Sequence, residues 1–171
     1  GLYCSRMIAL DPTAFCASHT QAVSELLGET RQAQFDGLAS ATATMFGCPI
    51  GAISVVECDR QWFKAVTDPS IDEIPVEQSI CRHAFDGTDL LVVEDLTKDA
   101  RFSANPLVTD GGMRFYAGRP IWVRIGPESD PVPIGALCLV DFVPRNFSAQ
   151  ERETLEQLGL AAQSLVQAAI D

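Results

Sequence analysis

The stretch IGAISVVE, Ile50 to Glu57, constrains the fold more than any other part of the sequence. Its apolar residues are β-branched or small, and they do not follow the 3.6-residue period of a helix. Such a run is typical of a strand that is buried on both faces. We therefore expect other parts of the chain to cover the sheet that contains it on each side.

Further apolar segments complete the predicted sheet. They are residues 61–66, 90–95, 113–125 and 133–141. The turn Cys58-Asp59-Arg60 joins the first of them to IGAISVVE, and the turn-rich GPESDPVP joins the last two, so we predict two hairpins. The sequence thus favours an α+β fold with a mainly antiparallel sheet.

Three amphipathic helices are predicted around this sheet. Ser18 and Gln21 have the spacing of a capping box before a short helix that ends at Gly28. A second helix carries an apolar stripe from Phe35 to Phe46 and ends at Gly47. Ser148 and Glu151 form another capping box before the last helix, whose apolar residues recur at three- and four-residue intervals. These helices can cover one face of the sheet.

Shorter and irregular segments are left for the other face. SICRHAFDG predicts a short helix with Ser79 as its N-cap and Gly87 as its end. TKDARFSANPLVTDGG, residues 97–112, predicts an irregular segment. Its last part, NPLVTDGG, is expected to form a flexible lid, in which Gly111 and Gly112 allow the chain to turn into the next strand. Gly118, inside that strand, allows another group to pack close to the sheet.

Charge and composition restrict the partners. The formal net charge is −11, which disfavours binding to nucleic acid or to an anionic membrane surface. The six cysteines contain no C-x-x-C pair and indicate reduced thiols in a cytoplasmic protein. Cys48, Cys58 and Cys138 adjoin apolar runs and are predicted as small core residues. With only two histidines and no repeated ligand spacing, we expect no metal site.

Two side-chain pairs could belong to a site. Cys81 and His83 could form a reactive thiol and imidazole, but residues two apart on a helix point to different sides. We therefore favour a buried Cys81 and a hydrogen-bonded His83 at the edge of a cavity. Trp62 and Phe63 alternate along a strand, so one should lie in the helix-side core and the other nearer the cavity.

Arg114 and Tyr116 should share one face of their strand, with Phe115 on the other. Arg114 and Arg119 could bind a carboxylate or phosphate. Alternatively, Arg114 pairs with Asp95 or Asp99 and holds the lid to the sheet.

Several strings resemble those of bacterial GAF domains. They are RQWFKA, IPVEQSICRHAF, LVVEDLTKDARFSANPLV, MRFYAGRPI and PIGALCLVD, and the likeness extends roughly from Gln32 to Ala168. The resemblance implies a GAF-like, or profilin-like, six-stranded antiparallel sheet, with long helices on one face and a ligand cavity under short helices and loops on the other. It implies an N-terminal segment and helix at 1–30 and a GAF domain at 31–171.

The resemblance also implies a role in signal transduction. GAF domains bind a small molecule and pass a signal through their terminal helices, commonly as dimers, to partners such as a histidine kinase or a cyclic-dinucleotide enzyme. The NKFDE string of cyclic-nucleotide-binding relatives is absent, and Cys81-Arg82-His83 differs from the Cys-His of bilin-binding relatives. The resemblance therefore supports neither of these ligands, and the cofactor is unknown.

The expected ligand-binding residues are Trp62, Phe63, Cys81, His83, Asp95, Phe102, Leu107, Arg114, Phe115 and Tyr116. No catalytic motif is found, so an enzyme is not expected. Two alternatives stay open. One is an enzyme of the free methionine sulfoxide reductase type that uses Cys81, and the other is an interaction module whose cavity is filled by its own side chains.

Overall fold

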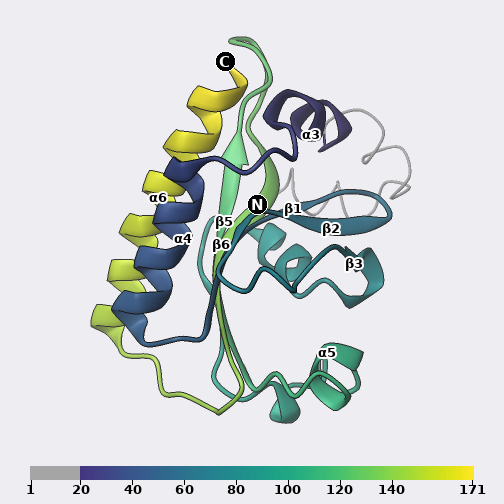
Figure 1. The fold of residues 1–171 in the computed structure, drawn as a ribbon, viewed down its shortest axis with the longest axis vertical. Helices are drawn as coiled ribbons and strands as arrows, with labels where there is room; N and C mark the ends of the chain where they lie inside the picture. Colours follow the sequence, from purple (N-terminus) through teal and green to yellow (C-terminus); the bar gives the residue numbers. More distant parts are fainter. Residues whose placement is uncertain (1–19) are drawn as a thin grey trace.

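The computed structural model describes residues 20–171, and its centre is a six-stranded sheet. Figure 1 shows this sheet with two long helices along one side. The strand order is β3-β2-β1-β6-β5-β4, and every pair of neighbours is antiparallel. The strands are β1 (Ile50–Val56), β2 (Arg60–Val66), β3 (Ile74–Pro75), β4 (Leu91–Val93), β5 (Phe115–Val123) and β6 (Val132–Asp141). The predicted α+β fold and both predicted hairpins are confirmed.

The IGAISVV segment forms β1 at the middle of the sheet, and all seven of its residues are buried. It pairs with β2 on one side and with β6 on the other. Val55 lies opposite Gly135 of β6, where a Cβ atom would collide with the carbonyl oxygen of Ser54. The lack of a side chain at Gly135 therefore allows β1 and β6 to approach closely.

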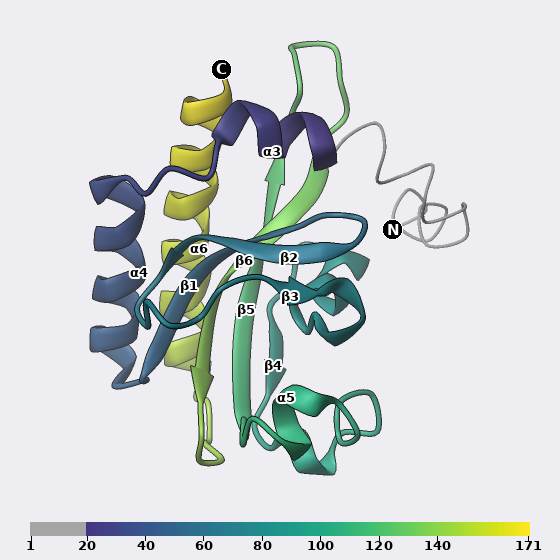
Figure 2. The same cartoon turned by 45° about the vertical axis from the view of Figure 1, so that its right-hand side comes forward.

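Three helices cover one face of the sheet. They are α3 (Gln21–Leu27), α4 (Ala33–Phe46) and α6 (Ala149–Ile170), and α4 and α6 lie side by side in both ribbon views (Figures 1 and 2). The predicted capping box of α6 is confirmed, because Ser148 and Glu151 each bond to the other's backbone N–H. Gly28 and Gly47 end α3 and α4 with positive φ. The capping box predicted at Ser18 lies outside residues 20–171.

Short elements cover the opposite face, on the right in Figure 2. They are the 3₁₀ turns η2 (Val76–Gln78), η3 (Cys81–Asp86) and η4 (Leu96–Lys98) and the helix α5 (Pro106–Thr109). The helix predicted in SICRHAFDG is η3, but its N-cap is Ile80 and not the predicted Ser79, whose hydroxyl still accepts a hydrogen bond from the Arg82 N–H. Neither β3 nor α5 was predicted, since two to four residues are too few to show a period.

Three of the four cysteines in the described part are buried. Cys48, Cys81 and Cys138 are core residues, and the prediction for Cys48 and Cys138 is confirmed. The prediction for Cys58 is wrong, because it lies exposed in the turn between β1 and β2. All four are free thiols. Among residues 20–171, no helix is both long and apolar enough to cross a membrane.

Candidate functional site

An apolar cavity of about 270 Å³ lies between the sheet and the short elements that cover it. Its floor is formed by β1, β2, β5 and β6, and its cover by η3, α5 and the segment before β3. The lining residues are Ile50, Ala52, Gln61, Phe63, Val66, Ile71, Asp72, Glu73, Ile74, Ile80, Cys81, Leu107, Met113, Tyr116, Cys138 and Val140. The cavity is therefore a partly open, mostly hydrophobic space with polar groups at a few points, as small-molecule sites commonly are.

A hydrogen bond from η3 to the sheet sets one end of this cavity. The Ser79 hydroxyl donates to Oε1 of Gln61 at 2.5 Å, and both residues are buried. Ile80 and Cys81 follow directly, so this bond holds their side chains over the sheet. Asn105, which caps α5, donates to the carbonyl of Gln78 at 3.1 Å and so joins the two parts of the cover.

Cys81, Cys138 and Tyr116 form a buried polar cluster at the cavity wall. The Tyr116 hydroxyl donates to Sγ of Cys81 at 3.1 Å. A hydrogen bond with the Cys138 thiol lowers the pKa of Cys81, and the same bond raises the pKa of Cys138. Burial raises the pKa of Tyr116 well above its usual value. Tyr116 therefore stays protonated and can donate its hydroxyl proton to Cys81.

Gly118 explains how Tyr116 reaches Cys81. A Cβ atom at Gly118 would collide with the hydroxyl end of the Tyr116 ring. The ring therefore lies along its own strand, over the space that Gly118 leaves open. This confirms the expectation that Gly118 allows another group to pack close to the sheet.

Four of the ten predicted ligand-binding residues line the cavity: Phe63, Cys81, Leu107 and Tyr116. Trp62 and Phe115 lie on the opposite face, in the core between the sheet and the helices. The Trp62 indole donates to Ser24 of α3 at 3.0 Å and to Glu57 at 3.2 Å. The alternation predicted for Trp62 and Phe63, and for Phe115 and Tyr116, is confirmed.

The other four predicted residues lie around the cover, outside the cavity lining. His83 is half-buried and packs edge-on against Phe102, with 4.9 Å between ring centroids. Asp95 caps η4 by accepting from the N–H and hydroxyl of Thr97. Arg114 donates to the carbonyl oxygens of Val108 and Met113. Arg114 thus holds the lid to the sheet, but through carbonyl oxygens and not through the predicted pairing with Asp95 or Asp99.

Sequence reasoning missed several residues of the cavity. Gln61, Ile71, Met113 and Cys138 line it but were not named as site residues. Cys138 could have been found from alternation, because Ala136, Cys138 and Val140 lie on the same face of β6 and all three belong to the cavity-side core. Ile71 lies in the irregular link between β2 and β3, where no period indicates which way a side chain points.

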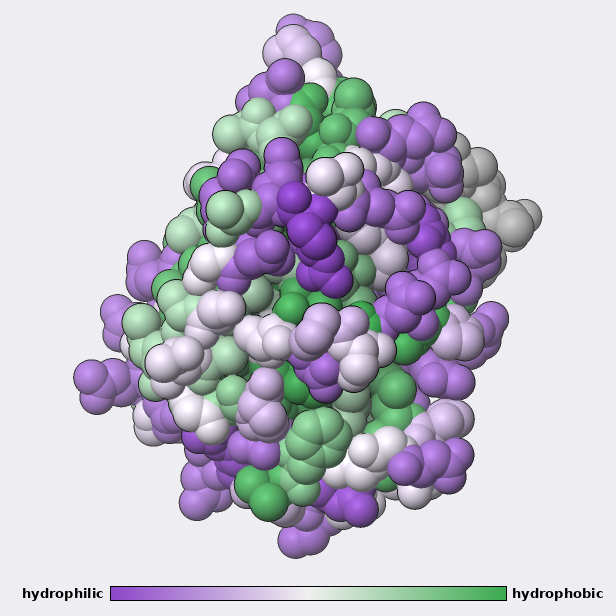
Figure 3. Space-filling view, viewed as in Figure 1, coloured by the Kyte–Doolittle hydropathy of each residue, from purple (hydrophilic) through white to green (hydrophobic). Residues whose placement is uncertain are grey.

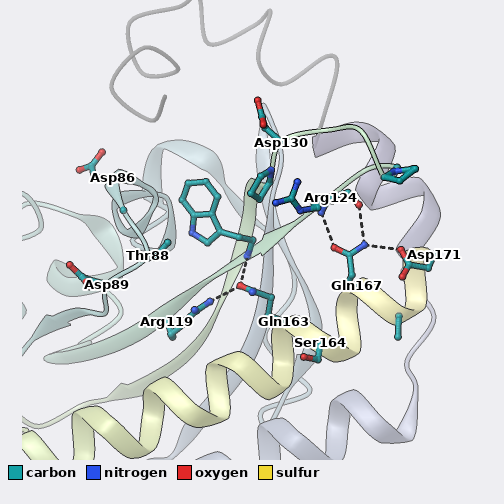
Figure 4. Close-up of a pocket in the computed structure, with 16 residues that line it drawn as sticks. Asp86, Thr88, Asp89, Arg119, Arg124, Asp130, Gln163, Ser164, Gln167 and Asp171 are labelled. Carbon is teal, nitrogen blue, oxygen red and sulfur yellow. Dashed lines mark hydrogen bonds between the residues drawn. The ribbon is translucent and has the colours of Figure 1, made fainter. Parts of the chain in front are cut away.

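A second hollow lies between β5, the end of α6 and the segment after η3, and Figure 4 shows it. It is a wide groove of about 1420 Å³. Its polar side chains bond to one another: Gln163 accepts from Arg119 and from the N–H of Trp122, and Gln167 accepts from the N–H of Arg124. We prefer the smaller cavity as the ligand site, since it is more enclosed and its lining is more apolar.

The family model described as GAF domain matches residues 11–164. A cyclic di-GMP phosphodiesterase of Pseudomonas aeruginosa is 36% identical over 126 residues, which are 73% of this chain and 21% of that protein. The chain therefore spans about a fifth of the length of this relative.

Solved structures with the same fold have low sequence identity. A domain of a putative two-component sensor histidine kinase from Sinorhizobium meliloti covers 78% of this chain with 89% of its own length, at 14% identity and a TM-score of 0.56. A far-red cyanobacteriochrome photoreceptor covers 80% of this chain with 85% of its own length, at 12% sequence identity and a TM-score of 0.65. A free methionine-R-sulfoxide reductase from Neisseria meningitidis covers 94% of this chain with 90% of its own length, at 16% sequence identity and a TM-score of 0.59.

Proposed function

The chain belongs to the GAF domain family, and from this premise we propose that it is a sensory domain that binds a small molecule in the cavity between the sheet and its short helices. The observation that carries the proposal is the cavity itself, with its apolar lining and the polar cluster of Cys81, Cys138 and Tyr116 at one wall. On the opposite face, buried side chains fill the core. Binding would act as a signal if the ligand prefers one arrangement of the cover over another.

Native mass spectrometry of the protein purified from its own organism tests this proposal. A retained small molecule that disappears on denaturation is the expected result. If repeated preparations carry no molecule and a metabolite screen gives no thermal shift, the proposal fails and the interaction module without a ligand is favoured.

We propose further that the domain acts as a homodimer through α4 and α6. Their outward surface carries two exposed large apolar residues, Met45 and Leu160, among small residues such as Ala41 and Ala161. Figure 3 shows pale and green atoms along the side where α4 and α6 lie, with purple atoms between them. Small side chains allow two helical surfaces to approach closely, and the apolar ones gain from burial.

Sedimentation velocity tests the dimer. Leu160→Arg should convert a dimer to a monomer, because it would bury a charge in the interface. Val143→Arg is the matched control: Val143 is also exposed but lies in the loop after β6. A wild type that sediments as a monomer at micromolar concentration would refute this part.

The signal would leave through α6 toward a cytoplasmic output protein such as a histidine kinase or a cyclic-dinucleotide enzyme. The 36% identity to a fifth of a cyclic di-GMP phosphodiesterase supports the second kind of output. Measuring the phosphodiesterase activity of this relative, with its matching segment replaced by the present domain, tests the point. We expect the hybrid protein to keep its phosphodiesterase activity and this activity to change when the ligand of the present domain is added.

A second candidate is an enzyme of the free methionine sulfoxide reductase type, and the lowered pKa of Cys81 beside Cys138 favours it. The two thiols would together give up two electrons and two protons, the sulfoxide oxygen would leave as water, and a disulfide would form. Turnover of free methionine sulfoxide with a thiol reductant, lost in Cys81→Ser, would support it. A wild type without turnover removes it.

A further inference from the structure

The cavity lining contains no Lys, Arg or His among the described residues. The arginines next to it have other partners. Arg60 binds Glu57, Glu29 and Glu73 at 2.6–2.8 Å, and Arg114 donates to two backbone carbonyls. A negatively charged ligand would therefore lose its hydration in the cavity without gaining a cationic partner, which is strongly unfavourable.

The charges that do border the cavity are negative. Asp72 and Glu73 are exposed residues at its rim, in the segment before β3. Arg60 neutralises Glu73 through a contact of 2.6 Å. Asp72 adds to the negative charge of the entrance, and the net charge of −11 acts in the same direction at longer range. An anion is thus opposed at the entrance as well as inside.

The polar groups of the wall suit an uncharged partner. Gln61 and Tyr116 are neutral side chains, and Tyr116 stays protonated because burial raises its pKa. The Gln61 oxygen already accepts from Ser79 and the Tyr116 hydroxyl already donates to Cys81, so the capacity left for a ligand is the Gln61 NH₂ group as donor and the Tyr116 oxygen as acceptor. Apart from the sulfur-containing residues and the two acidic residues at the rim, the rest of the lining is aliphatic or aromatic, with Ile50, Val66 and Phe63 as examples.

The volume limits the size of the occupant. The cavity volume of about 270 Å³ lies just below the range of about 300–1,000 Å³ that is usual for ligand pockets. A ligand of roughly ten non-hydrogen atoms fills such a space, whereas a dinucleotide has several times that number. The cavity therefore cannot enclose a whole cyclic dinucleotide unless the cover opens.

We infer that this cavity binds an uncharged, largely apolar molecule of roughly ten non-hydrogen atoms with one hydrogen-bonding group at the Cys81–Tyr116 wall, and that it rejects phosphate-bearing nucleotides. The inference rests on the proposed ligand-binding function and specifies its ligand. The cyclic dinucleotide that names the phosphodiesterase relative is therefore not the molecule that this domain senses.

Matched pairs of compounds test the role of charge. Octanol and octanoate have equal chain length and differ in the charge of the end group. Indole, cyclic GMP and cyclic di-GMP extend the set. Binding is followed by ligand-detected NMR and by thermal shift at one pH near neutrality. We expect octanol and indole to bind, octanoate to bind at least tenfold more weakly, and both nucleotides not to bind.

Two variants test whether the compounds bind in this cavity. Ala52 is buried in β1 and lines the floor, so Ala52→Leu fills part of the space and should weaken octanol binding at least tenfold. Ala33→Leu, the same change at an exposed position of α4, should leave it unchanged. If Ala52→Leu does not fold, Met113→Lys takes its place: Met113 is only partly buried, and the new cation should reverse the preference so that octanoate binds better than octanol.

The outcomes separate the inference from the proposed function. Octanoate binding as tightly as octanol, or a nucleotide whose binding is lost in Ala52→Leu, overturns the inference and leaves a ligand-binding sensor. Binding of no compound in the set also overturns it, and native mass spectrometry then decides independently whether the domain holds any small molecule.

Discussion

The two faces of the sheet are covered in different ways. On the helix face, Phe35, Leu155 and Val166 are fully buried, and long helices supply continuous packing. On the cavity face, short 3₁₀ turns and loops leave about 270 Å³ unfilled, and Phe63 and Ile71 remain partly exposed. The helix face therefore stabilises the fold through close packing, whereas the cavity face leaves space for a ligand at some cost in packing.

We expect the largest effect on stability when the same substitution, Phe to Ala, is made once on each face. Phe35→Ala removes a fully buried ring and should lower the free energy of unfolding by about 3–5 kcal/mol. Phe63→Ala enlarges a space that already exists and should cost about 1–2 kcal/mol. Urea unfolding of the two variants measures the difference. Equal losses of unfolding free energy would show that the two faces contribute equally to stability and would contradict this difference.

Gly118→Ala tests the close contact on the cavity face. The added methyl group collides with the Tyr116 ring, and we expect a loss of about 1–3 kcal/mol. In a Tyr116→Ala background the same change should cost much less, because the nearest atoms to the new Cβ all belong to that ring. A double-mutant cycle by chemical denaturation measures the coupling, and additive effects would contradict this account.

Gln163→Ala tests how α6 is attached to the edge of the sheet. It leaves the N–H of Trp122 and one N–H of Arg119 without their acceptor and should cost about 1 kcal/mol. Hydrogen exchange of the Trp122 amide should become faster. Gln157→Ala, an exposed position on the same helix, is the control and should leave that rate unchanged.

The smallest effect that we expect is a change of stability with pH in the acidic range. The hydrogen bond and charge of Arg101 lower the pKa of Asp99 from its ordinary value of 3.8. The ionised carboxylate therefore stabilises the cavity-side loop fully above that value, and this contribution is lost as the pH falls through the lower value of the folded state.

The stability difference between wild type and Asp99→Asn should accordingly be a few tenths of a kcal/mol at about pH 6 and should shrink as the pH is lowered below 3.8. Asp110→Asn, at an exposed position, serves as the control. Thermal unfolding across this range measures both variants. A difference for Asp99→Asn that does not depend on pH would contradict the assignment.

The helix face could be predicted almost completely from the sequence. Helical periods, the capping box at Ser148 and the stop at Gly47 are local signals, and they fixed α4 and α6. Alternation along β2 and β5 correctly separated Trp62 from Phe63 and Phe115 from Tyr116. These are features that a few neighbouring residues determine.

The cavity face depends on contacts between distant segments, which no local pattern contains. The contact between Cys81 and Cys138 joins η3 to β6, and the bond from Ser79 to Gln61 joins it to β2. Arg114 was correctly expected to hold the lid, but its acceptors are carbonyl oxygens, and any residue type supplies those. The sequence alone therefore indicates which segments surround the cavity better than which side chains line it.

The attachment of α6 has a geometric consequence for movement. Gln163 and Gln167 are four residues apart, about 6 Å along a helix, and they bond to the N–H groups of Trp122 and Arg124, two residues and about 6.6 Å apart along a strand. A slide of α6 along β5 in either direction lengthens both bonds together and also pulls the buried Leu155 and Val166 out of their packing. The two glutamines therefore fix the axial position of the helix, so that β5 and α6 are expected to move as one body.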